Sequence, residues 1–341
     1  MVATTRDCDE NVARTLRLSI TGECNLSCFY CKPLGRARAL FETKNLIQPS
    51  DVTKLVKIVG ELGVTRVIIA GGEPLLRKDA ANFVKAASAH KAIEEVRVVT
   101  NGTRLKDFAD PLRKMGLRKI DVNFDSLDFR KYQRITGEDH LYRVLDGVDK
   151  VEKLHYTDIR LNILLLSGIN DGEVINFSRM TKDHKVHLRF IEYHPKVASG
   201  DPYADRPTLS VLGVKRMIDN FQQLRQVEFS ADDDGSAPAW QFVDGLGKIS
   251  FVSRMELDKE EAEPRILFNA DGTLSNEINP QRSQPILEEL RRDAKEDRLH
   301  RMIEKIMRSP SVSRKPERAP AVLVARGRPS ASKSRRAVAT H

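Results

Sequence analysis

The sequence predicts an α/β fold in which six parallel strands, each followed by a helical stretch, curl into a partial barrel of the (βα)6 TIM-like type. One observation and one general rule predict it. Short runs of β-branched and aliphatic residues alternate with amphipathic stretches of helical spacing. Right-handed crossovers between such units place the strands side by side and parallel. The predicted strands cover residues 16–20, 66–70, 96–100, 120–124, 159–165 and 186–191.

Length and charge limit the classes of protein to which the chain can belong. A chain of 341 residues, 40% of them hydrophobic, can bury one large core and a smaller appendage. No apolar run approaches the roughly 18 residues of a membrane span, so we expect a soluble, cytoplasmic protein that makes no membrane contact. The net charge of +9 is concentrated at the end, where residues 308–341 hold nine Lys or Arg and one acid. The rest is nearly neutral, which argues against a nucleic-acid-binding body.

The elements of the predicted barrel can be placed in order along the chain. Residues 1–13 are polar and are expected to be a flexible N-terminus. The barrel is predicted over residues 14–230. Among its helices, one is predicted from Ser50 to Leu62, with Ser50 as the N-cap, and another from Lys78 to His90. Because parallel sheets carry their chemistry at the carboxyl ends of their strands, we expect the functional site there.

A smaller region is predicted to follow the barrel, over residues 231–307. It ends in a single long helix from Gln284 to Met307, which contains i,i+4 ion pairs such as Glu288 with Arg292. We expect this helix to pack across the outside of the barrel.

The last segment, residues 308–341, is rich in Pro, Ser, Arg and Ala and is predicted to be a disordered basic tail. Within it, Arg326-Gly327-Arg328-Pro329 resembles the core of an AT-hook, which places arginines in the minor groove of DNA. Contact of the tail with DNA and a tail that is simply solvated are both open interpretations.

Three cysteines follow the first predicted strand, with spacings that bring Cys24, Cys28 and Cys31 onto one short loop. Such a loop can present three sulfurs to one face of an iron–sulfur cube and leaves one iron without a protein thiolate. The remaining cysteine, Cys8, lies upstream in the polar segment. An iron with an open position is a reactive site, as an open zinc position is. A zinc site and inert thiols are the alternatives, although the chain has no second pair of ligands at the usual spacing.

A second motif lies at the end of the strand predicted over residues 66–70. There the chain continues as Gly71-Gly72-Glu73-Pro74. Adjacent glycines permit a close approach that a Cβ atom blocks, so main-chain groups can meet the amino-acid end of a ligand. An ordinary turn between strand and helix is the alternative.

Together, the Cys-x3-Cys-x2-Cys motif, with Tyr30 before its last cysteine, and the Gly-Gly-Glu-Pro motif resemble the signatures of the radical S-adenosylmethionine (SAM) superfamily. The resemblance implies one [4Fe–4S] cluster held by the three cysteines, with SAM bound to its open iron. It also implies reductive cleavage of SAM to a 5′-deoxyadenosyl radical that abstracts hydrogen from a substrate. The SAM contacts implied by these two motifs are Tyr30, Gly71, Gly72 and Glu73.

Further motifs, over about residues 14–280, are similar to those of the GTP 3′,8-cyclases of molybdenum cofactor biosynthesis. They begin at Val99, Asp121, Tyr132, Ser167 and Leu188. This resemblance implies a small-molecule substrate, which in the family is a nucleotide, and an electron donor such as flavodoxin or ferredoxin. Arg17 and Arg160 stand at nucleotide-contacting positions of the family, and Asn123 and His194 at SAM-contacting positions. A structural ion pair of Arg17 and a turn role of His194 remain open.

Several family positions are altered in this chain. The family holds a second cluster with three C-terminal cysteines, and acids stand at those positions here, so we expect no second cluster of that kind. Carboxylates suit a divalent ion or a cationic substrate, or they are simply solvated. Apolar residues also replace cationic or polar nucleotide contacts. The altered positions are Glu260, Glu263 and Glu277 for the cluster, and Ile68, Val99 and Leu267 for the nucleotide.

The sequence therefore predicts a radical SAM enzyme with one cluster that acts on a substrate other than GTP, with other nucleotides as candidates. A divergent GTP 3′,8-cyclase that works without the second cluster is one alternative. The other is a cluster-bearing regulatory protein whose basic tail binds nucleic acid, for which steeply salt-dependent binding is the expected signature.

Overall fold

The computed structural model describes residues 14–31, 46–193, 207–227, 237–256, 265–276, 283–292 and 296–307. These residues belong to one compact unit and form a sheet of twelve strands. The strand order is β12-β11-β10-β1-β2-β3-β4-β5-β6-β9-β8-β7. The central strands are β1 (Thr15–Ser19), β2 (Arg66–Ala70), β3 (Glu95–Thr100), β4 (Lys119–Asn123), β5 (Asp158–Leu165) and β6 (His187–Glu192). The outer strands are β7 (Leu224–Val227), β8 (Ala239–Phe242), β9 (Lys248–Val252), β10 (Arg265–Phe268), β11 (Thr273–Asn276) and β12 (Gln284–Pro285).

Helices connect the strands and cover the sheet. They are α1 (Pro49–Glu61), α2 (Ala80–Ala87), α3 (Leu105–Lys114), α4 (Phe129–Thr136), α5 (Leu141–Lys153), α6 (Val174–Asp183), α7 (Val211–Phe221), α9 (Leu287–Arg291) and α10 (Glu296–Met307). Two short 3₁₀ turns are η1 (Pro74–Leu76) and η2 (Asp171–Glu173). None of the helices in the described part of the chain is long and apolar enough to cross a membrane.

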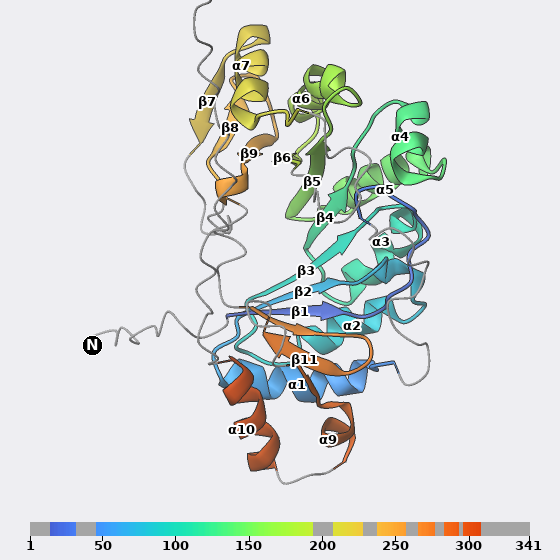
Figure 1. Cartoon of the computed structure of the whole chain (residues 1–341), viewed down its shortest axis with the longest axis vertical. Helices are drawn as coiled ribbons and strands as arrows, with labels where there is room; N and C mark the ends of the chain where they lie inside the picture. Colours follow the sequence, from blue (N-terminus) through green and yellow to red (C-terminus); the bar gives the residue numbers. More distant parts are fainter. Residues whose placement is uncertain are drawn as a thin grey trace, which may run out of the picture. The chain divides into compact units, whose positions relative to one another are not determined.

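The six central strands confirm the predicted α/β fold, and each begins and ends within one residue of its predicted limits. They pair in parallel and in chain order, and Figure 1 shows them as a fan with α2, α3 and α5 along one side. The barrel is not closed, because β1 pairs with β10 and β6 with β9, both in parallel. Both edges of the central sheet are therefore covered by strands that come later in the chain.

The two faces of the central strands differ in chemistry. Residues that point toward the helices are buried and aliphatic, as in Val98 of β3, Ile120 of β4 and Leu161 of β5. The alternate residues of the same strands include Arg97 and Asp121, which are charged and also buried. Because side chains alternate along a strand, one face of the sheet packs against the helices and forms the core. The opposite face, which we call the polar interior of the sheet, carries the charged residues.

The predicted helix starts need one correction. Helix α1 begins at Pro49 with Gln48 as its N-cap, so the prediction that Ser50 caps it was wrong. Proline suits the first helical position because its missing N–H would have no partner there. Ser50 is the second residue of the helix, and the Asp51 carboxylate accepts the N–H of the N-cap residue Gln48 at 2.8 Å.

The predicted long helix from Gln284 to Met307 was also wrong, because this segment forms β12 and two separate helices. Pro285 lies in β12, opposite Thr273, and α9 ends at its C-cap Arg292, whose backbone is extended with a ψ of 142°. The expected pair of Glu288 with Arg292 is present at 3.2 Å, at the end of α9. Both α9 and α10 contact α1.

The remaining predictions on organisation are not decided by the described residues. The flexible N-terminus (1–13) and the basic tail (308–341) lie outside them. The boundary near residue 230 stays a prediction, since the strands after it join the same sheet as the barrel strands.

Candidate functional site

The three cysteines lie on a loop, residues 24–31, that follows β1 at the carboxyl edge of the sheet. We call this segment the cysteine loop. Its backbone is held by the end of α4, since the N–H of Ser27 donates to the Thr136 carbonyl at 2.7 Å and that of Phe29 to the Ile135 carbonyl at 3.2 Å. A helix ends with unpaired carbonyls, so the end of α4 offers acceptors that fix the loop.

The glycine pair after β2 packs against the chain leading into the cysteine loop. The N–H of Gly72 donates to the Thr21 carbonyl at 2.7 Å. A Cβ atom would lie 2.4 Å from the Thr21 oxygen at Gly71 and 2.1 Å from the Glu23 oxygen at Gly72. Only glycine fits at this distance, and Gly71 also has a φ of +143°, which side chains rarely adopt. The close approach that the sequence indicated is therefore made to protein backbone, and a role of these glycines in binding SAM stays a prediction.

Glu73, the next residue, is fully buried and binds the ends of two strands together. Its carboxylate accepts the N–H of Leu75 at 2.9 Å, the hydroxyl of Thr100 at 2.7 Å and the N–H of Asn101 at 2.7 Å. Burial raises the pKa of Glu73, while these three donors oppose the increase. The carboxylate thus fixes the loop after β3 beside the loop after β2.

The sulfur of Cys24 accepts hydrogen bonds from neighbouring amides. The N–H of Leu26 lies 3.4 Å from it and the side-chain amide of Asn101 3.8 Å. The same Asn101 amide donates to the side chain of Asn25 at 3.0 Å, which fixes its orientation. Donors directed at a sulfur stabilise the thiolate form, which is the form that binds metals.

Cys28 lies deeper in the site than Cys31, which is exposed. Burial, followed by the negative charge of Asp125, raises the pKa of Cys28 to about 12. A thiol of this kind ionises when a metal takes the place of its proton. No three His, Cys, Asp or Glu side chains in the described ranges converge on one metal ion. Each thiolate of an iron–sulfur cube ligates its own iron, so its sulfurs need not meet around a single ion.

Tyr30 contacts the barrel from the cysteine loop. Its hydroxyl donates a short hydrogen bond to the carboxylate of Asp125, at the end of β4. The other oxygen of Asp125 accepts the N–H of Leu164 at 2.8 Å. Burial raises the pKa of Asp125 to about 6, although both hydrogen bonds act to lower it. Tyr30 therefore ties the cysteine loop to β4 and β5 through its side chain, and its role as a SAM contact stays a prediction.

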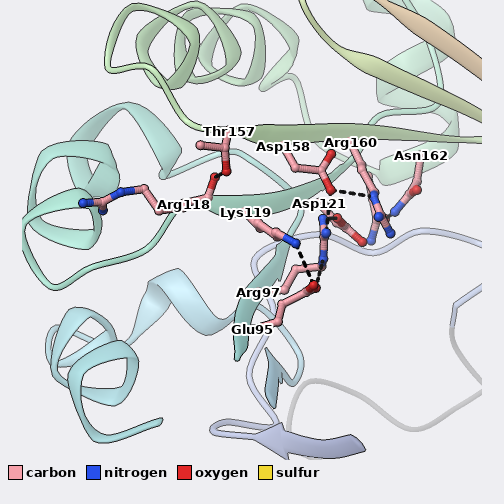
Figure 2. Close-up of polar contacts among 10 residues, drawn as sticks. Glu95, Arg97, Arg118, Lys119, Asp121, Thr157, Asp158, Arg160 and Asn162 are labelled. Atoms are coloured by element: carbon pink, nitrogen blue, oxygen red, sulfur yellow. Dashed lines mark hydrogen bonds and ion pairs between the residues drawn. The ribbon is translucent and has the colours of Figure 1, made fainter. Parts of the chain in front are cut away.

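A cluster of six charged side chains lies near the starts of β3, β4 and β5, and we call it the basal ion cluster (Figure 2). At its centre Arg97, 3% exposed, contacts Asp121 and Asp158 at 2.6 Å each and Glu95 at 3.1 Å. Three cations and three carboxylates balance in charge. The members are Glu95, Arg97, Lys119, Asp121, Asp158 and Arg160.

Arg160, a predicted nucleotide contact, belongs to this cluster. It is 2% exposed, and its Nε donates to the carboxylate of Asp158 at 3.1 Å. Burial opposes ionisation of Asp158, but Arg97 and Arg160 together hold its pKa below the ordinary value. The positive charge of Arg160 is therefore balanced within the protein.

The other predicted site residues lie in different surroundings. Arg17 is exposed in the middle of β1, opposite Ile68. Asn123 ends β4 and accepts the side-chain amide of Asn162 at 3.2 Å. His194 and the three acids at the family's second-cluster positions lie outside the described residues, so these predictions stay untested. Those acids are Glu260, Glu263 and Glu277.

Sequence reasoning missed the residues that support the site. Asn101 and Asp125 stood within quoted motifs, but the sequence did not show that they contact Cys24 and Tyr30. The basal ion cluster had a visible signal, because charged residues alternate with aliphatic ones inside strands that were predicted as hydrophobic. That pattern indicates a polar face.

Comparisons with known proteins agree with this geometry. The sheet with a cysteine loop at its carboxyl edge defines a radical SAM domain, and the family model described as "Radical SAM superfamily" matches residues 18–180. GTP 3′,8-cyclases are similar over longer stretches. That of Thermodesulfovibrio yellowstonii is 30% identical over 259 residues, which are 76% of this chain and 80% of the relative. That of Vibrio atlanticus is 31% identical over 259 residues, which are 76% of this chain and 77% of the relative. This chain belongs to the GTP 3′,8-cyclase family of the radical SAM superfamily.

The similarity is stronger over a shorter part of the chain. The GTP 3′,8-cyclase of Lactiplantibacillus plantarum is 40% identical over 180 residues, which are 53% of this chain and 54% of the relative. In this comparison the chain spans about half the length of its relative. Among solved structures, Streptococcus suis SuiB bound to S-adenosylmethionine has a TM-score of 0.58 at 14% identity, over 82% of this chain and 64% of that one. That likeness shows the shared fold.

The residues present fit the cofactors of this superfamily. Three thiols lie on one loop, and Cys24 already accepts amide N–H groups as a thiolate would. Members of the superfamily use a [4Fe–4S] cluster to which SAM binds, and Cys24, Cys28 and Cys31 are the residues that would hold this cluster.

Proposed function

We propose that this protein is an enzyme that cleaves SAM reductively and uses the resulting radical to abstract hydrogen from a small-molecule substrate. The observation that carries the proposal is the cysteine loop, held at the carboxyl edge of the strands by α4, Gly72 and Tyr30. When bound, the cluster and SAM would supply the electron transfer and the 5′-deoxyadenosyl radical.

In this proposal the protein's own residues position and shield that chemistry. Glu73 and Asn101 fix the loops after β2 and β3 beside Cys24, and Tyr30 with Asp125 keeps the cysteine loop against the barrel. The polar interior of the sheet receives the substrate. Restriction of water around the site protects a reactive radical from side reactions. Flavodoxin or ferredoxin would supply the electron, and the cytoplasm would be the compartment.

We further propose that the substrate is not GTP, with other nucleotides as the first candidates. Arg160 is paired with Asp158 inside a cluster of zero net charge, so its charge is already compensated. Apolar side chains stand at two more interior positions, Ile68 and Val99. A triphosphate depends on charge-assisted hydrogen bonds, and these substitutions supply none.

A divergent GTP 3′,8-cyclase is the second candidate, because the family relationship is close and Arg17 remains exposed on β1. A third, a regulatory protein whose tail binds nucleic acid, is favoured by no observation on the described residues. Loss of salt-dependent DNA binding on deletion of residues 308–341 would support it.

One labelling experiment separates these candidates. The anaerobically reconstituted protein is given SAM, a reductant and GTP deuterated at ribose C3′, and the 5′-deoxyadenosine is analysed by mass spectrometry. Product without deuterium supports the proposal and directs the search to other nucleotides. Deuterium in the product would make the chain a cyclase. An intact cluster that yields no 5′-deoxyadenosine would overturn the enzyme assignment.

A further inference from the structure

Tyr132, on α4, has a buried hydroxyl that the described residues leave without a hydrogen-bond partner. The side chain is 1% exposed, and its oxygen contacts no donor or acceptor in the described part of the chain. A buried polar group without a partner costs about 1–3 kcal/mol, and most such groups in folded proteins are paired. The hydroxyl therefore indicates a partner other than the described residues.

The position of Tyr132 on α4 places it beside the cysteine loop. It lies one helical turn before Thr136, whose carbonyl holds Ser27 of that loop, and the Thr136 hydroxyl donates back to the Tyr132 carbonyl at 2.9 Å. Residues four apart share one face of a helix. Burial, followed by the charges of Cys28 and Asp125, raises the pKa of Tyr132 above its ordinary value. The hydroxyl thus keeps its proton near neutral pH and is a hydrogen-bond donor.

Nearby protein acceptors are already engaged. One oxygen of Asp125 accepts the hydroxyl of Tyr30 and the other the N–H of Leu164. The Cys24 sulfur accepts two amide donors. The group still expected beside these residues is the iron–sulfur cluster, whose sulfurs are acceptors.

We propose that the hydroxyl of Tyr132 donates a hydrogen bond to a sulfur of the bound [4Fe–4S] cluster, close to Cys28, and thereby raises the cluster's reduction potential. This inference rests on the proposed function, because it needs the cluster. A donor at a cluster sulfur stabilises the reduced form, which carries the additional negative charge. Tyr132 is then a positioning and tuning residue, which makes the cluster easier to reduce.

The test uses Tyr132→Phe, which removes one oxygen atom and keeps the ring. Tyr156→Phe is the matched control, because Tyr156 is also buried but its hydroxyl donates to the Ala109 carbonyl at 2.8 Å. Both variants and the unaltered protein are reconstituted anaerobically. Each is equilibrated at a series of fixed potentials, and the reduced cluster is quantified by electron paramagnetic resonance. At a fixed potential, the ratio of reduced to oxidised cluster should fall about threefold or more in Tyr132→Phe. It should not change in Tyr156→Phe.

A second measurement detects the hydrogen bond directly. Electron–nuclear double resonance on the reduced cluster, in H2O and in D2O, should show the exchangeable protons of the Leu26 and Asn101 amides and one further exchangeable proton in the unaltered protein. This further signal should be absent from Tyr132→Phe and kept in Tyr156→Phe. Equal potentials and identical proton signals in all three proteins would overturn the inference while the proposed function stands. A protein that assembles no cluster would overturn both. If Tyr132→Phe fails to fold, a spectrum of the unaltered protein with no exchangeable proton beyond the two amides decides against the inference.

Discussion

The two edges of the central sheet, where its strands start and where they end, are built on opposite principles. At their starts, the basal ion cluster gathers Arg97 with Glu95, Asp121 and Asp158, and its charges cancel within the protein. At the carboxyl edge, the cysteine loop presents three thiols, and the hydroxyl of Tyr132 on the neighbouring helix α4 has no partner among the described residues. The basal ion cluster therefore contributes to stability and the carboxyl edge to chemistry. We expect substitutions in the first to change the free energy of unfolding and substitutions in the second to change SAM cleavage.

The largest effect is expected from Cys28→Ala, which removes one of the three thiols. SAM cleavage should fall at least about 1,000-fold, because a cluster that lacks a ligand is not retained. Anaerobic turnover and iron content are the measurements. Cys8→Ala is the matched control, since Cys8 lies outside the motif. About four irons per chain should remain in the control, and retention of full activity in Cys28→Ala would remove the cysteine loop from the mechanism.

Arg97→Met, in the basal ion cluster, should lower stability and leave SAM cleavage nearly unchanged. It leaves three carboxylates near the interior without their central cation, and breaking a buried ion pair in this way costs about 3–5 kcal/mol. The midpoint of denaturant unfolding, followed by circular dichroism, should fall. Cleavage of SAM per iron-loaded chain should stay near that of the unaltered protein. Loss of activity in a folded, loaded variant would place the basal ion cluster in the catalytic machinery.

The two ends should also respond to acid with opposite signs. The pKa of Asp125 rises from an ordinary 3.8 to about 6 in the folded state, so the folded chain binds its proton first. This contribution to stability is lost as pH rises from about 3.8 through about 6, and lowering the pH from 7 to 4.5 should regain about 2 kcal/mol. The pKa of Asp158 is lowered, so its contribution is present above 3.8 and lost at lower pH. Thermal unfolding against pH measures both.

Asp125→Asn and Asp158→Asn assign these slopes. Asp125→Asn should remove the change of stability between pH 4.5 and 7 and keep the loss of stability at more acidic pH. Asp158→Asn should reduce only that loss at acidic pH. Identical profiles for all three proteins would show that neither carboxylate governs the pH dependence.

The smallest change is expected from Glu73→Gln, at the boundary of the two regions. The Glu73 carboxylate accepts three hydrogen bonds through its two oxygens. A glutamine side chain has one oxygen and one NH2 group, so its NH2 group would face the N–H of Asn101 or of Leu75. The free energy of unfolding should fall by about 2 kcal/mol. Iron should also be lost faster under a chelator. An unchanged rate of iron loss would mean that Glu73 holds the strands but not the cysteine loop.

Much of the fold could be predicted from the sequence, because local patterns determine it. The central strands were placed within one residue, since aliphatic runs between helical stretches have few other interpretations. The C-terminal strands were missed because their partners are distant in the chain, since β10 pairs with β1 and β9 with β6. The end of α9 left no comparable signal, because Arg292 is extended although arginine favours helices.

The site was predictable in part for a similar reason. The three cysteines carry a signal in their spacing, which any reader of the sequence can test. Contacts such as Tyr30 with Asp125, or the burial of the Tyr132 hydroxyl, depend on how distant segments pack. No spacing rule predicts these contacts, and the interior pairing of Arg160 with Asp158 became clear only from the geometry.

The pairing of β1 with β10 has a consequence for biosynthesis. The strand that leads into the cysteine loop receives one of its two neighbours only when Arg265–Phe268 has been made, about 250 residues later. At a synthesis rate of 5–20 residues per second, one edge of β1 waits roughly 12 to 50 s on the ribosome. During that time the open edge can pair wrongly with other strands. Yield in the cell should therefore depend on chaperones and on the timing of cluster delivery.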